Sequence, residues 1–410
     1  MNKFLICEDG ELLKNFPKLI KEKKSKITVI SRKKSSLTKN KYVDRFISID
    51  SPASANFNDN FLANKKLISK LNGWIIWGND EIMRRVANSN LPLTEKLRIL
   101  PTKRKSGLRL LGSKVGQAEV ANRLKLRVPK TMVAKNSAEL RRYSSKFETP
   151  FIVKADRYGG GAFLKKVSNA KERKELRISK EWYPVVIQKF IVGQIISVEG
   201  FFKDGALIAW MYSSFKDSVG EYGPSSSREF KNPDVLDFEL DLILLAKECG
   251  LHGMFNCTFI LKDTKHYLIE ADARPNSWQF LYAYFKLPIM EIMNGEQESP
   301  PTPLAPNLEN AAVRIVDLDR IIPYAVSKKD YKTVFHSLRR LRKSTQWIAG
   351  KKITIVLVVF STIVTHRYQR VKLKLFFYAV ARFRALPERL QQLIKKLGLT
   401  RFIAFKIFRV

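Results

Sequence analysis

The stretch FNCTFILKDTKHYLIEADAR, residues 255–274, constrains the fold more than any other part of the chain. Two apolar runs separated by a short polar segment predict a β-hairpin. The second run ends in Glu270, Asp272 and Arg274. Side chains two residues apart on a strand share a face, with Cα atoms about 6.6 Å apart. The pattern therefore predicts two carboxylates pointing the same way, with an arginine beyond them.

Paired carboxylates of this kind have a chemical use. Mg²⁺ binds a few carboxylate oxygens and completes its octahedron with waters and substrate phosphates, so Glu270 and Asp272 could supply those oxygens. Arg274 could hold a transferring phosphoryl group or stabilise developing negative charge. The alternative is that a strand end carries charge only because it faces solvent, and the spacing alone does not decide between the two.

The charge of the chain is strongly positive and unevenly placed. Its 410 residues contain 75 Lys and Arg against 38 Asp and Glu, a net charge of +37. Residues 331–410 hold 19 of these cations and one acidic residue, Glu388. About half of the excess therefore lies in the last fifth of the chain. An anionic partner, either lipid headgroups or nucleic acid, is the natural complement of such a segment.

The length and the 45% hydrophobic content predict two or three folded domains or lobes. Cys7, Cys249 and Cys257 form no CxxC pair, which fits a reducing compartment and argues against a structural zinc site. The N-terminus reaches charged residues too early for a signal peptide. We therefore expect a cytoplasmic protein.

The first hundred residues alternate short apolar runs with amphipathic stretches. The apolar runs are NKFLIC, KITVISR, RFISID and GWIIWG. This alternation is typical of a parallel sheet covered by helices, so residues 1–100 are predicted to form a small Rossmann-like α/β lobe. No GxGxxG follows the first strand, which argues against a dinucleotide site of that kind.

From residue 101 the pattern changes to mixed α+β. A helix is expected at residues 113–126 with Ser113 as its N-cap, and a long helix at LDFELDLILLAKECG. Strands are expected at FIVKA, FLKKV, VVIQKFI and IISVEGFFKDGALIAWMYSS. The proline-rich ESPPTPLAP, residues 298–306, marks a linker. Residues 101–297 are therefore predicted as one domain and residues 307–410 as a basic C-terminal extension.

The segment RYGGGAF, residues 157–163, follows the FIVKA strand that carries Lys154. Consecutive glycines let backbone N–H groups approach phosphate oxygens, so this loop could cover a phosphate. A glycine triplet alone more commonly marks a hairpin turn, and a strand-end lysine is usually solvated. Neither feature decides the function without the others.

Two polar segments have open interpretations. DSVGEYGPSSSREF, residues 217–230, is predicted as a polar loop; Arg228 could bind a substrate carboxylate there, and an ordinary surface loop explains the segment equally well. WGNDEIM places Asn79, Asp80 and Glu81 at a strand end, where α/β folds often present ligand-contacting groups.

The order of these features resembles the ATP-grasp family over roughly residues 100–285. In chain order the features are Lys114 at a helix start, VPKT, FIVKADRYGGGAF, VVIQKFIVGQIISVEGFFKDG, GLHGMFNCTFI and YLIEADARPN. The sequence looks most similar to the carbamoyl-phosphate synthase large subunit, biotin carboxylase and D-alanine:D-alanine ligase type. The resemblance implies an ATP-grasp domain with a small lobe to about residue 191 and a large lobe after it, preceded by the Rossmann-like lobe.

The resemblance also implies roles for individual residues. The ATP site would comprise Lys114, Lys154, Gly159, Gly160, Gly161, Gln188, Lys189, Phe190, Ile191 and Gln194. In this set the glycines form a lid, and residues 188–191 read adenine largely through backbone groups. Mg²⁺ or Mn²⁺ would bind Glu270 and Asp272, with Thr258 at or near the upstream ligand position. Lys154 and Arg274 would serve catalysis, and Arg228 and Asn276 are candidates for substrate binding.

Several positions depart from the family's pattern. Asp272 replaces an asparagine and keeps an oxygen ligand, whereas Thr258 is a weaker ligand than the acidic or Gln side chain usual there. Gln188 and Gln194 stand where relatives often have glutamates, one of which can hold the ribose. We therefore expect a reduced affinity for a second metal ion.

The resemblance implies an ATP-dependent carboxylate–amine or carboxylate–thiol ligase. ATP phosphorylates a carboxylate to an acylphosphate, and the nucleophile then displaces phosphate. Such chemistry depends on positioning and charge neutralisation, so His252, His266, His336 and His366 are expected to be bystanders. The alternative is a catalytically weakened ATP-binding scaffold or regulatory protein at a membrane surface, which Thr258 and the glutamines would also fit.

The C-terminal extension contains ITIVLVVFSTIV, residues 353–364, which is shorter than the about 20 apolar residues of a membrane span. The mixture of Lys and Arg with aromatic and aliphatic residues after it predicts helices lying on an anionic membrane surface, at the inner face. Packing on the rest of the chain, or oligomerisation as a homodimer, is the other interpretation. Nucleic acid is the less favoured partner.

Overall fold

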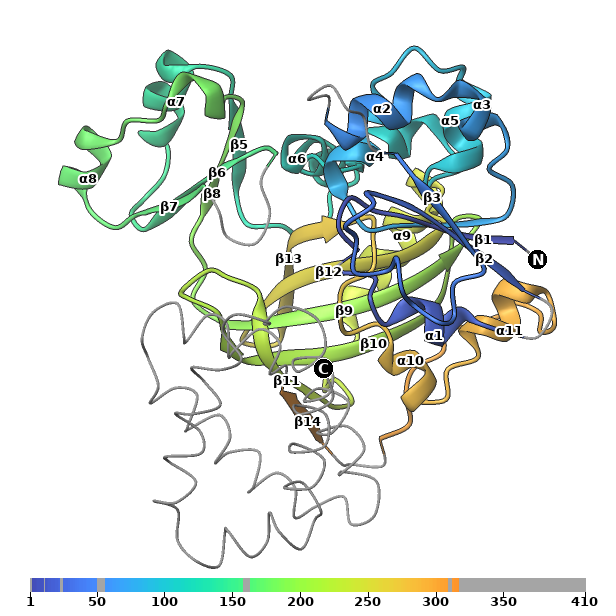
Figure 1. Cartoon of the computed structure of the whole chain (residues 1–410). Coiled ribbons are helices and arrows are strands. Elements are labelled where there is room, and N and C mark those ends of the chain that lie inside the picture. The colour runs from blue at the N-terminus through green and yellow to red at the C-terminus, as the bar shows by residue number, and fades with distance from the viewer. Residues whose placement is uncertain are drawn as a thin grey trace, which may run out of the picture. The chain divides into compact units, whose positions relative to one another are not determined.

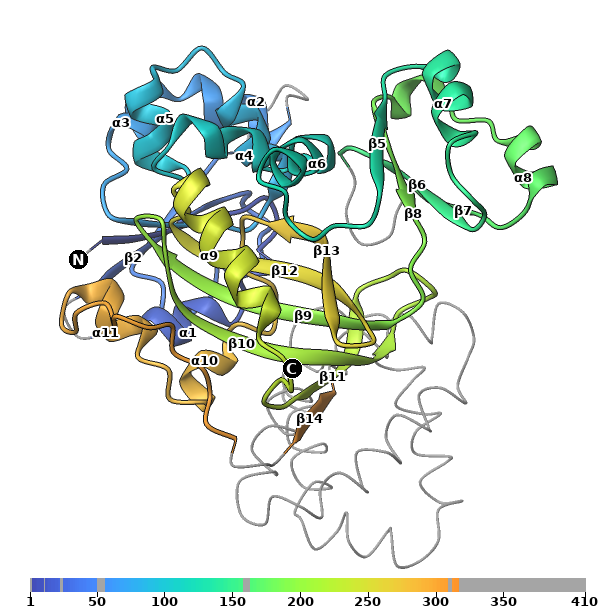
Figure 2. The ribbon, with the colours of Figure 1, turned by 180° about the vertical axis from the view of Figure 1, so that it is seen from behind.

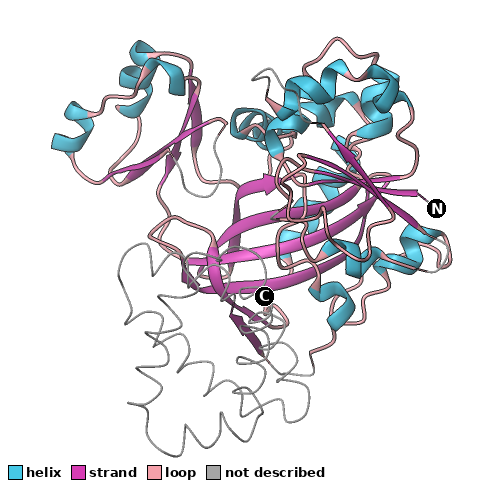
Figure 3. Ribbon diagram, in the orientation of Figure 1, coloured by secondary structure: helices cyan, strands magenta, loops and turns pink. Residues whose placement is uncertain are grey.

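The computed structural model describes residues 2–10, 12–22, 25–49, 56–157, 163–308 and 312–316 (Figure 1). They belong to a compact unit that spans Met1–Val316. The predicted lid glycines Gly159, Gly160 and Gly161, and nearly all of the C-terminal extension, lie outside the described residues. Within the described part the fold is mixed α/β with three sheets, drawn in magenta in Figure 3.

The first sheet is parallel, with strand order β3-β2-β1-β4, as the alternation of apolar and amphipathic stretches predicted. Neighbouring residues such as Leu5 and Ile6 are both fully buried, so helices and loops cover both faces. The strands are β1 (Asn2–Ile6), β2 (Lys26–Ser31), β3 (Arg45–Ser48) and β4 (Trp74–Trp77). The helices are α1 (Phe16–Ile20), α2 (Phe57–Ala63), α3 (Lys65–Ser69), α4 (Asp80–Ala87) and α5 (Leu93–Ile99).

The second sheet is antiparallel, with order β5-β8-β6-β7, and has a small core of its own around Phe151 and Ile187. It is reached through a 3-10 turn, η1 (Lys105–Leu110), and helix α6 (Lys114–Arg123). Its other elements are β5 (Thr131–Ala134), α7 (Ser137–Ser144), β6 (Phe151–Ala155), β7 (Leu164–Val167), α8 (Ala170–Glu175), η2 (Lys180–Trp182) and β8 (Val185–Lys189).

The third sheet has six strands, in the order β13-β12-β9-β10-β11-β14. Helix α9 (Asp237–Cys249) lies against it in Figure 2, and Phe238 of this helix meets the ring of Trp210 edge-on at 5.3 Å. The strands are β9 (Gln194–Lys203), β10 (Ala206–Ser218), β11 (Ser225–Phe230), β12 (Gly253–Lys262), β13 (Lys265–Asp272) and β14 (Val313–Val316). Two short helices, α10 (Leu281–Tyr284) and α11 (Ile289–Asn294), follow β13.

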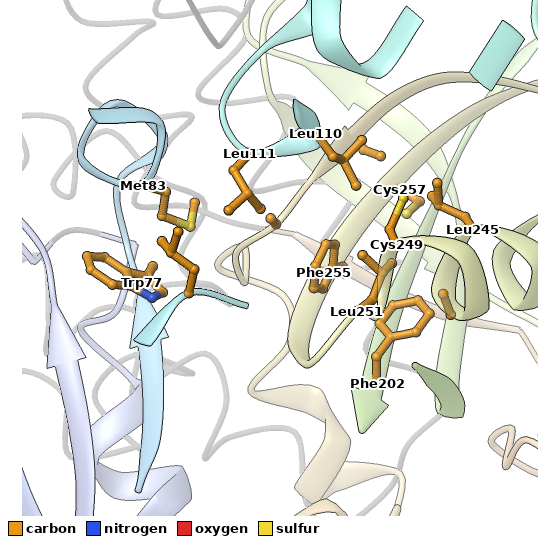
Figure 4. Packing of buried hydrophobic residues seen from close by; sticks show 14 of the residues in the cluster. Trp77, Met83, Leu110, Leu111, Phe202, Leu245, Cys249, Leu251, Phe255 and Cys257 are labelled. Carbon is orange, nitrogen blue, oxygen red and sulfur yellow. The ribbon is translucent and has the colours of Figure 1, made fainter. Parts of the chain in front are cut away.

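A shared hydrophobic core joins the first sheet to the third. Figure 4 shows Trp77 and Met83 near one end of this core, and Phe202, Leu245 and Phe255 near the other. Burial of such large side chains stabilises the arrangement by about 1.5–3 kcal/mol each. All three cysteines are buried and free, so no disulfide contributes.

One expectation about local structure is wrong. Residues 225–230 do not belong to a polar loop but form β11, which pairs antiparallel with β10 and with β14. Ser225, Ser227 and Arg228 are buried because the ladder and the ion pair of the arginine satisfy their polar groups. Only residues 219–224 remain as the connecting turn.

The chain beyond the proline-rich segment continues the third sheet. Leu304, within residues 298–306, forms a bridge to Ala209, and its carbonyl accepts from the Trp210 N–H at 2.9 Å. Strand β14 then extends the sheet beside β11. The division into domains at residues 100, 297 and 306 stays a prediction. Among the helices of the described ranges, none is long and apolar enough to cross a bilayer.

Candidate active site

The N-terminus of α6 is tied to the end of β6. Ser113 caps the helix as predicted, with Oγ accepting from the Gly116 N–H at 2.9 Å. Asp156, which follows β6, accepts at Oδ1 from the Ser113 hydroxyl and from the Val115 N–H, both at 2.9 Å. These bonds fix the position of Lys114, the first residue of the helix.

Lys154 in β6 directs its ammonium group to β8 and β13. Its Nζ donates to Gln188 Oε1 at 2.9 Å and to the carbonyl of Ile269 at 3.5 Å. Burial, opposed by the Glu270 carboxylate and assisted by the nearby Lys114, lowers the pKa of Lys154 to about 8. Lys154 therefore holds its proton less firmly than an ordinary lysine and gains from any anion that binds beside it.

A β-bulge presents the Ile269 carbonyl to Lys154. Thr258 of β12 pairs with Glu270 of β13, and the register then shifts between Thr258 and Phe259. The shift leaves Ile269 as the extra residue of the bulge. The bulge thus directs the Ile269 carbonyl toward Lys154, next to the two carboxylates that are predicted to bind a metal ion.

These groups line a shallow pocket that is open to solvent. Apolar walls with a few convergent polar groups are typical of small-molecule sites, and two ammonium groups favour an anionic ligand. The lining residues are Lys114, Gln117, Ala118, Ala121, Val128, Thr131, Lys154, Val186, Gln188, Leu268 and Ile269.

The predicted adenine-reading segment contributes Gln188 to this pocket. The Gln188 side chain is buried, and its Nε2 donates to Thr131 Oγ1 at 3.2 Å. The backbone N–H groups of Lys189 and Phe190 donate to the carbonyls of neighbouring strand ends. Those two N–H groups are therefore already used within the sheet. Ile191 and Gln194 follow, and Gln194 is exposed at the start of β9.

Glu270 brings a carboxylate to the lysines. Its Oε1 lies 3.5 Å from Lys114 Nζ, with the two side chains 34% and 22% exposed. The spacing argument placed Asp272 on the same face. Asp272 pairs across the ladder with Asn256, and Glu270 pairs with Thr258. The four side chains therefore form two adjacent rows on one side of the sheet.

Arg274 lies between two carboxylates. Its Nε donates to Asp80 Oδ2 at 2.6 Å, and Nη2 donates to Asp272 Oδ2 at 3.0 Å. Burial raises the pKa of Asp272 to about 8, because the opposing Arg274 only partly offsets burial while Glu270 and Asp80 add negative charge. Asp80 is the first residue of α4, so this contact connects α4 to the segment that follows β13.

The two candidate substrate residues meet at a buried glutamate. Arg228 Nη1 forms an ion pair with Glu199 Oε1, and Asn276 Nδ2 donates to the same oxygen at 2.9 Å. All three side chains are buried. Neither Arg228 nor Asn276 lines the pocket beside Lys154.

Sequence reasoning missed several residues of this region. Gln117 accepts at Oε1 from the Ala271 N–H at 3.1 Å and so holds α6 against β13. Asp156 and Glu199 were not singled out either. A signal existed for Glu199, because a carboxylate inside the apolar run of β9 must find partners.

The metal candidates form a sparse set of ligands. No group of three or more His, Cys, Asp and Glu within the described ranges is arranged to hold a metal ion. Glu270 and Asp272 provide two carboxylates, and Thr258 provides a hydroxyl beside them. Phosphate oxygens and water would have to supply the remaining ligands, which is the usual manner of Mg²⁺ binding at nucleotide sites.

Comparison with curated proteins gives a partial match. No family model matches the chain. Carbamoyl phosphate synthase large chain from Saccharolobus islandicus is 23% identical over 189 residues, which are 41% of this chain and 18% of the relative. The chain thus spans less than a fifth of the length of the curated relatives that it matches first.

Solved structures extend the likeness to most of the chain. Biotin carboxylase from Campylobacter jejuni has a TM-score of 0.56 at 17% identity, covering 74% of this chain and 72% of that one. Phosphoribosylamine–glycine ligase from Thermotoga maritima has a TM-score of 0.55 at 16% identity, with coverages of 77% and 80%. The chain has the ATP-grasp fold. A third ATP-grasp structure, an ADP complex of N5-carboxyaminoimidazole ribonucleotide synthetase, has a TM-score of 0.58 at 16% identity, with coverages of 80% and 85%.

Proposed function

We propose that this ATP-grasp chain is an ATP-dependent ligase that activates a carboxylate as an acylphosphate and transfers the acyl group to an amine or thiol. The observation that carries the proposal is the convergence of Lys114, Lys154 and Gln188 on one pocket, with Glu270 beside Lys114. Two ammonium groups in the pocket, with the carboxylates of Glu270 and Asp272 and the guanidinium of Arg274 at the adjoining end of β13, suit a nucleoside triphosphate and its metal ion.

The described residues fit a Mg²⁺ or Mn²⁺ ion. Asp272 is a partly buried carboxylate whose pKa is raised to about 8, and Glu270 and Asp80 lie near it. A divalent cation would favour the ionised forms of these carboxyl groups. Glu270 and Asp272 would bind the cation through their oxygens, and the Thr258 hydroxyl would be a weaker third ligand. When bound, the ion would neutralise charge on the phosphates.

The chain's own groups would perform the remaining tasks. Lys114 and Lys154 bind the phosphates, and the apolar walls around Val186 and Leu268 hold the base. Arg274, fixed by Asp80 and Asp272, stabilises negative charge on the transferring phosphoryl group. The nucleophile then attacks the acyl carbon, a C–N or C–S bond forms, and the C–O bond to the phosphate breaks. No protein nucleophile is required.

A second function has one observation in its favour. Thr258 stands beside Glu270 where an acidic or Gln ligand is usual in the family, and the ligand set contains only two carboxylates in the described residues. A catalytically weakened ATP-binding scaffold or regulatory protein would tolerate this. It predicts nucleotide binding without turnover. Association with a membrane through the basic extension is compatible with this alternative and with the ligase.

The experiment is Mg²⁺-dependent ADP release by the full chain with pooled carboxylates and pooled amines and thiols. The ligase predicts release that requires a carboxylate and an acceptor and that falls at least 100-fold in Glu270→Ala. Glu119→Ala, which removes an exposed carboxylate from α6, is the matched control and should keep wild-type release. ATP binding with no turnover on a broad panel would favour the scaffold.

A further inference from the structure

Helix α9 is apolar on two opposite sides. The side toward the third sheet is buried through Phe238, Leu242, Leu245, Ala246 and Cys249. The other side carries four exposed aliphatic side chains, here called the outer stripe: Leu236, Leu240, Ile243 and Leu244. Leu240 is 72% exposed, and Leu236, the N-cap residue, is 50% exposed. A helix that is apolar on all sides is normally buried on all sides, so the composition of α9 suits burial of the outer stripe as well.

Exposed apolar side chains are concentrated at this helix. Within the part of the chain that the structure describes, seven large hydrophobic side chains are exposed, and four of them form the outer stripe. The other three, Leu93, Val192 and Tyr284, lie on separate elements. Figure 2 shows α9 in front of β9 and β10. Single exposed apolar residues are common, whereas a contiguous group is typical of a surface that binds a partner.

The spacing of the outer stripe is that of a helix that packs along another helix. Leu236, Leu240, Ile243 and Lys247 follow one another in steps of four, three and four residues, which is the spacing of a coiled-coil contact. Lys247 is exposed, and its aliphatic stem can cover an apolar neighbour while its ammonium group stays in water. With its 13 residues α9 is about 20 Å long, so the contact has three to four layers.

The charges at the two ends of α9 indicate which helix fits. Near the N-terminus lie Glu239 of the first turn and Asp234, whose side chain is 85% exposed. Near the C-terminus lie Lys247 of the last turn and the exposed Arg104, which lies against the glycine that ends the helix. A second α9 in the antiparallel direction would bring each acidic end to a basic end. The two helix dipoles would also oppose each other favourably.

We propose that two copies of the chain form a dimer in which the outer stripes of α9 pack antiparallel about a two-fold axis. The four-three-four spacing then places Leu240 of one copy against Ile243 of the other, and Leu236 against the stem of Lys247. Every contact occurs twice, as a two-fold interface requires. One helix from each copy buries less than the roughly 800 Å² per partner of a standard interface, so the dissociation constant is on the order of 10 µM. The inference does not depend on the proposed ligase function.

The test is sedimentation velocity of the full chain at roughly 1–100 µM, a range that brackets this constant. The mass of wild type should rise with concentration from 47.3 kDa towards twice that value. Leu240→Glu places a charge at a position that is 72% exposed, so the monomer should fold normally while the dissociation constant rises at least 20-fold. Leu93→Glu is the matched control, because Leu93 is 43% exposed in α5, and it should stay within twofold of wild type.

A second variant guards against a folding defect. Leu236 caps α9 without a side-chain hydrogen bond, whereas serine is a preferred N-cap residue. Leu236→Ser should therefore melt no lower than wild type at 1 µM, where the chain is monomeric, and should still raise the dissociation constant at least fivefold. A dimer that neither variant weakens would use another surface.

Disulfide trapping tests the antiparallel register. The three native cysteines are buried, so introduced cysteines on α9 are the accessible ones among the described residues. Mixing Leu240→Cys with Ile243→Cys should give cross-linked dimers several-fold faster than either variant alone. Faster cross-linking within each separate variant would mean a parallel arrangement and would overturn the register.

Three further results would overturn the inference. Wild type may stay at 47.3 kDa over the whole range, or its dimer may survive Leu240→Glu, in which case the basic extension is the next surface to test. The third result is a monomeric wild type whose binding to phosphatidylcholine–phosphatidylserine vesicles is abolished by Leu240→Glu, because the outer stripe then contacts lipid. None of these measurements uses ADP release, so they leave the test of the ligase separate.

Discussion

Thr258 lies directly opposite Glu270 in the β12–β13 ladder, on the face of the sheet that also carries Asp272. This relationship identifies the position at which a further metal ligand could be added. We predict that Thr258→Glu lowers the Mg²⁺ concentration for half-maximal ADP release several-fold, because a third carboxylate joins the pair. Without Mg²⁺ the same variant should lose about 0.5–1 kcal/mol of stability, since like charges then face each other across the ladder.

Thr258→Gln separates ligand number from charge. It supplies an oxygen without adding a negative charge, so we expect a smaller gain in Mg²⁺ affinity and no loss of stability in the metal-free protein. Magnesium titrations of ADP release and urea unfolding measure the two effects. An unchanged magnesium dependence in Thr258→Glu would remove Thr258 from the metal site.

The pKa of Lys154 predicts how nucleotide binding depends on pH. Burial lowers that pKa to about 8, so the ammonium loses its proton as pH rises through 8, well before an ordinary lysine near 10.4. ATP affinity should therefore be constant below pH 7.5 and should fall by up to about tenfold per pH unit above 8. Lys154→Arg keeps its charge and should bind ATP with little change up to pH 9.5. Calorimetric titration at several pH values tests this; a flat wild-type profile to pH 9.5 would refute it.

The contacts of Arg274 with Asp80 and Asp272 predict separate effects on stability and activity. Arg274→Ala leaves two partly buried carboxylates without their cation and should lower the free energy of unfolding by about 2–4 kcal/mol. Arg274→Lys keeps the charge but cannot make both bonds in the same plane. We expect it to fold with a loss of about 1 kcal/mol and to release ADP roughly 100-fold more slowly. Near-normal turnover in Arg274→Lys would contradict the role of the guanidinium.

His266 predicts a loss of stability in mild acid. Its ring is buried between Asp237 and Tyr212, and burial with the nearby Arg127 lowers its pKa to about 4. The unfolded chain takes up the proton first, near pH 6.5, so stability present above that pH is lost as pH falls from 6.5 towards 4. At about 1.4 kcal/mol per pKa unit, the loss is on the order of 3 kcal/mol. Urea unfolding of wild type and His266→Gln at pH 7 and pH 4.5 compares the slopes; equal slopes would show that His266 does not titrate in this way.

Local sequence was sufficient to predict those features of the fold whose geometry depends on residues close together in the chain. The two-residue spacing in EADAR placed Glu270 and Asp272 on one face, and the strand register agrees. Ser113 before an amphipathic stretch predicted the N-cap of α6, which depends only on the next three residues. The alternation of apolar runs predicted the parallel sheet β1–β4 for the same reason.

Contacts between distant residues could not be predicted in this way. Asp80 meets Arg274 only because α4 and β13 come together through the shared core. Residues 225–230 are polar in sequence and became a buried strand because β10 and β14 pair with them and Glu199 neutralises Arg228. Strand β10 is adjacent in sequence, but β14 and Glu199 are distant from these residues, and no local propensity identifies them.

The measurement that tests the central claim most directly follows oxygen from the carboxylate into phosphate. Wild-type protein is incubated with Mg²⁺·ATP, an amine, and the stimulating carboxylate labelled with ¹⁸O, and the released phosphate is analysed by mass spectrometry. An acylphosphate predicts one ¹⁸O atom in each phosphate and no labelled phosphate from Glu270→Ala. Unlabelled phosphate from wild type would mean that water attacks ATP directly, and the ligase account would be wrong.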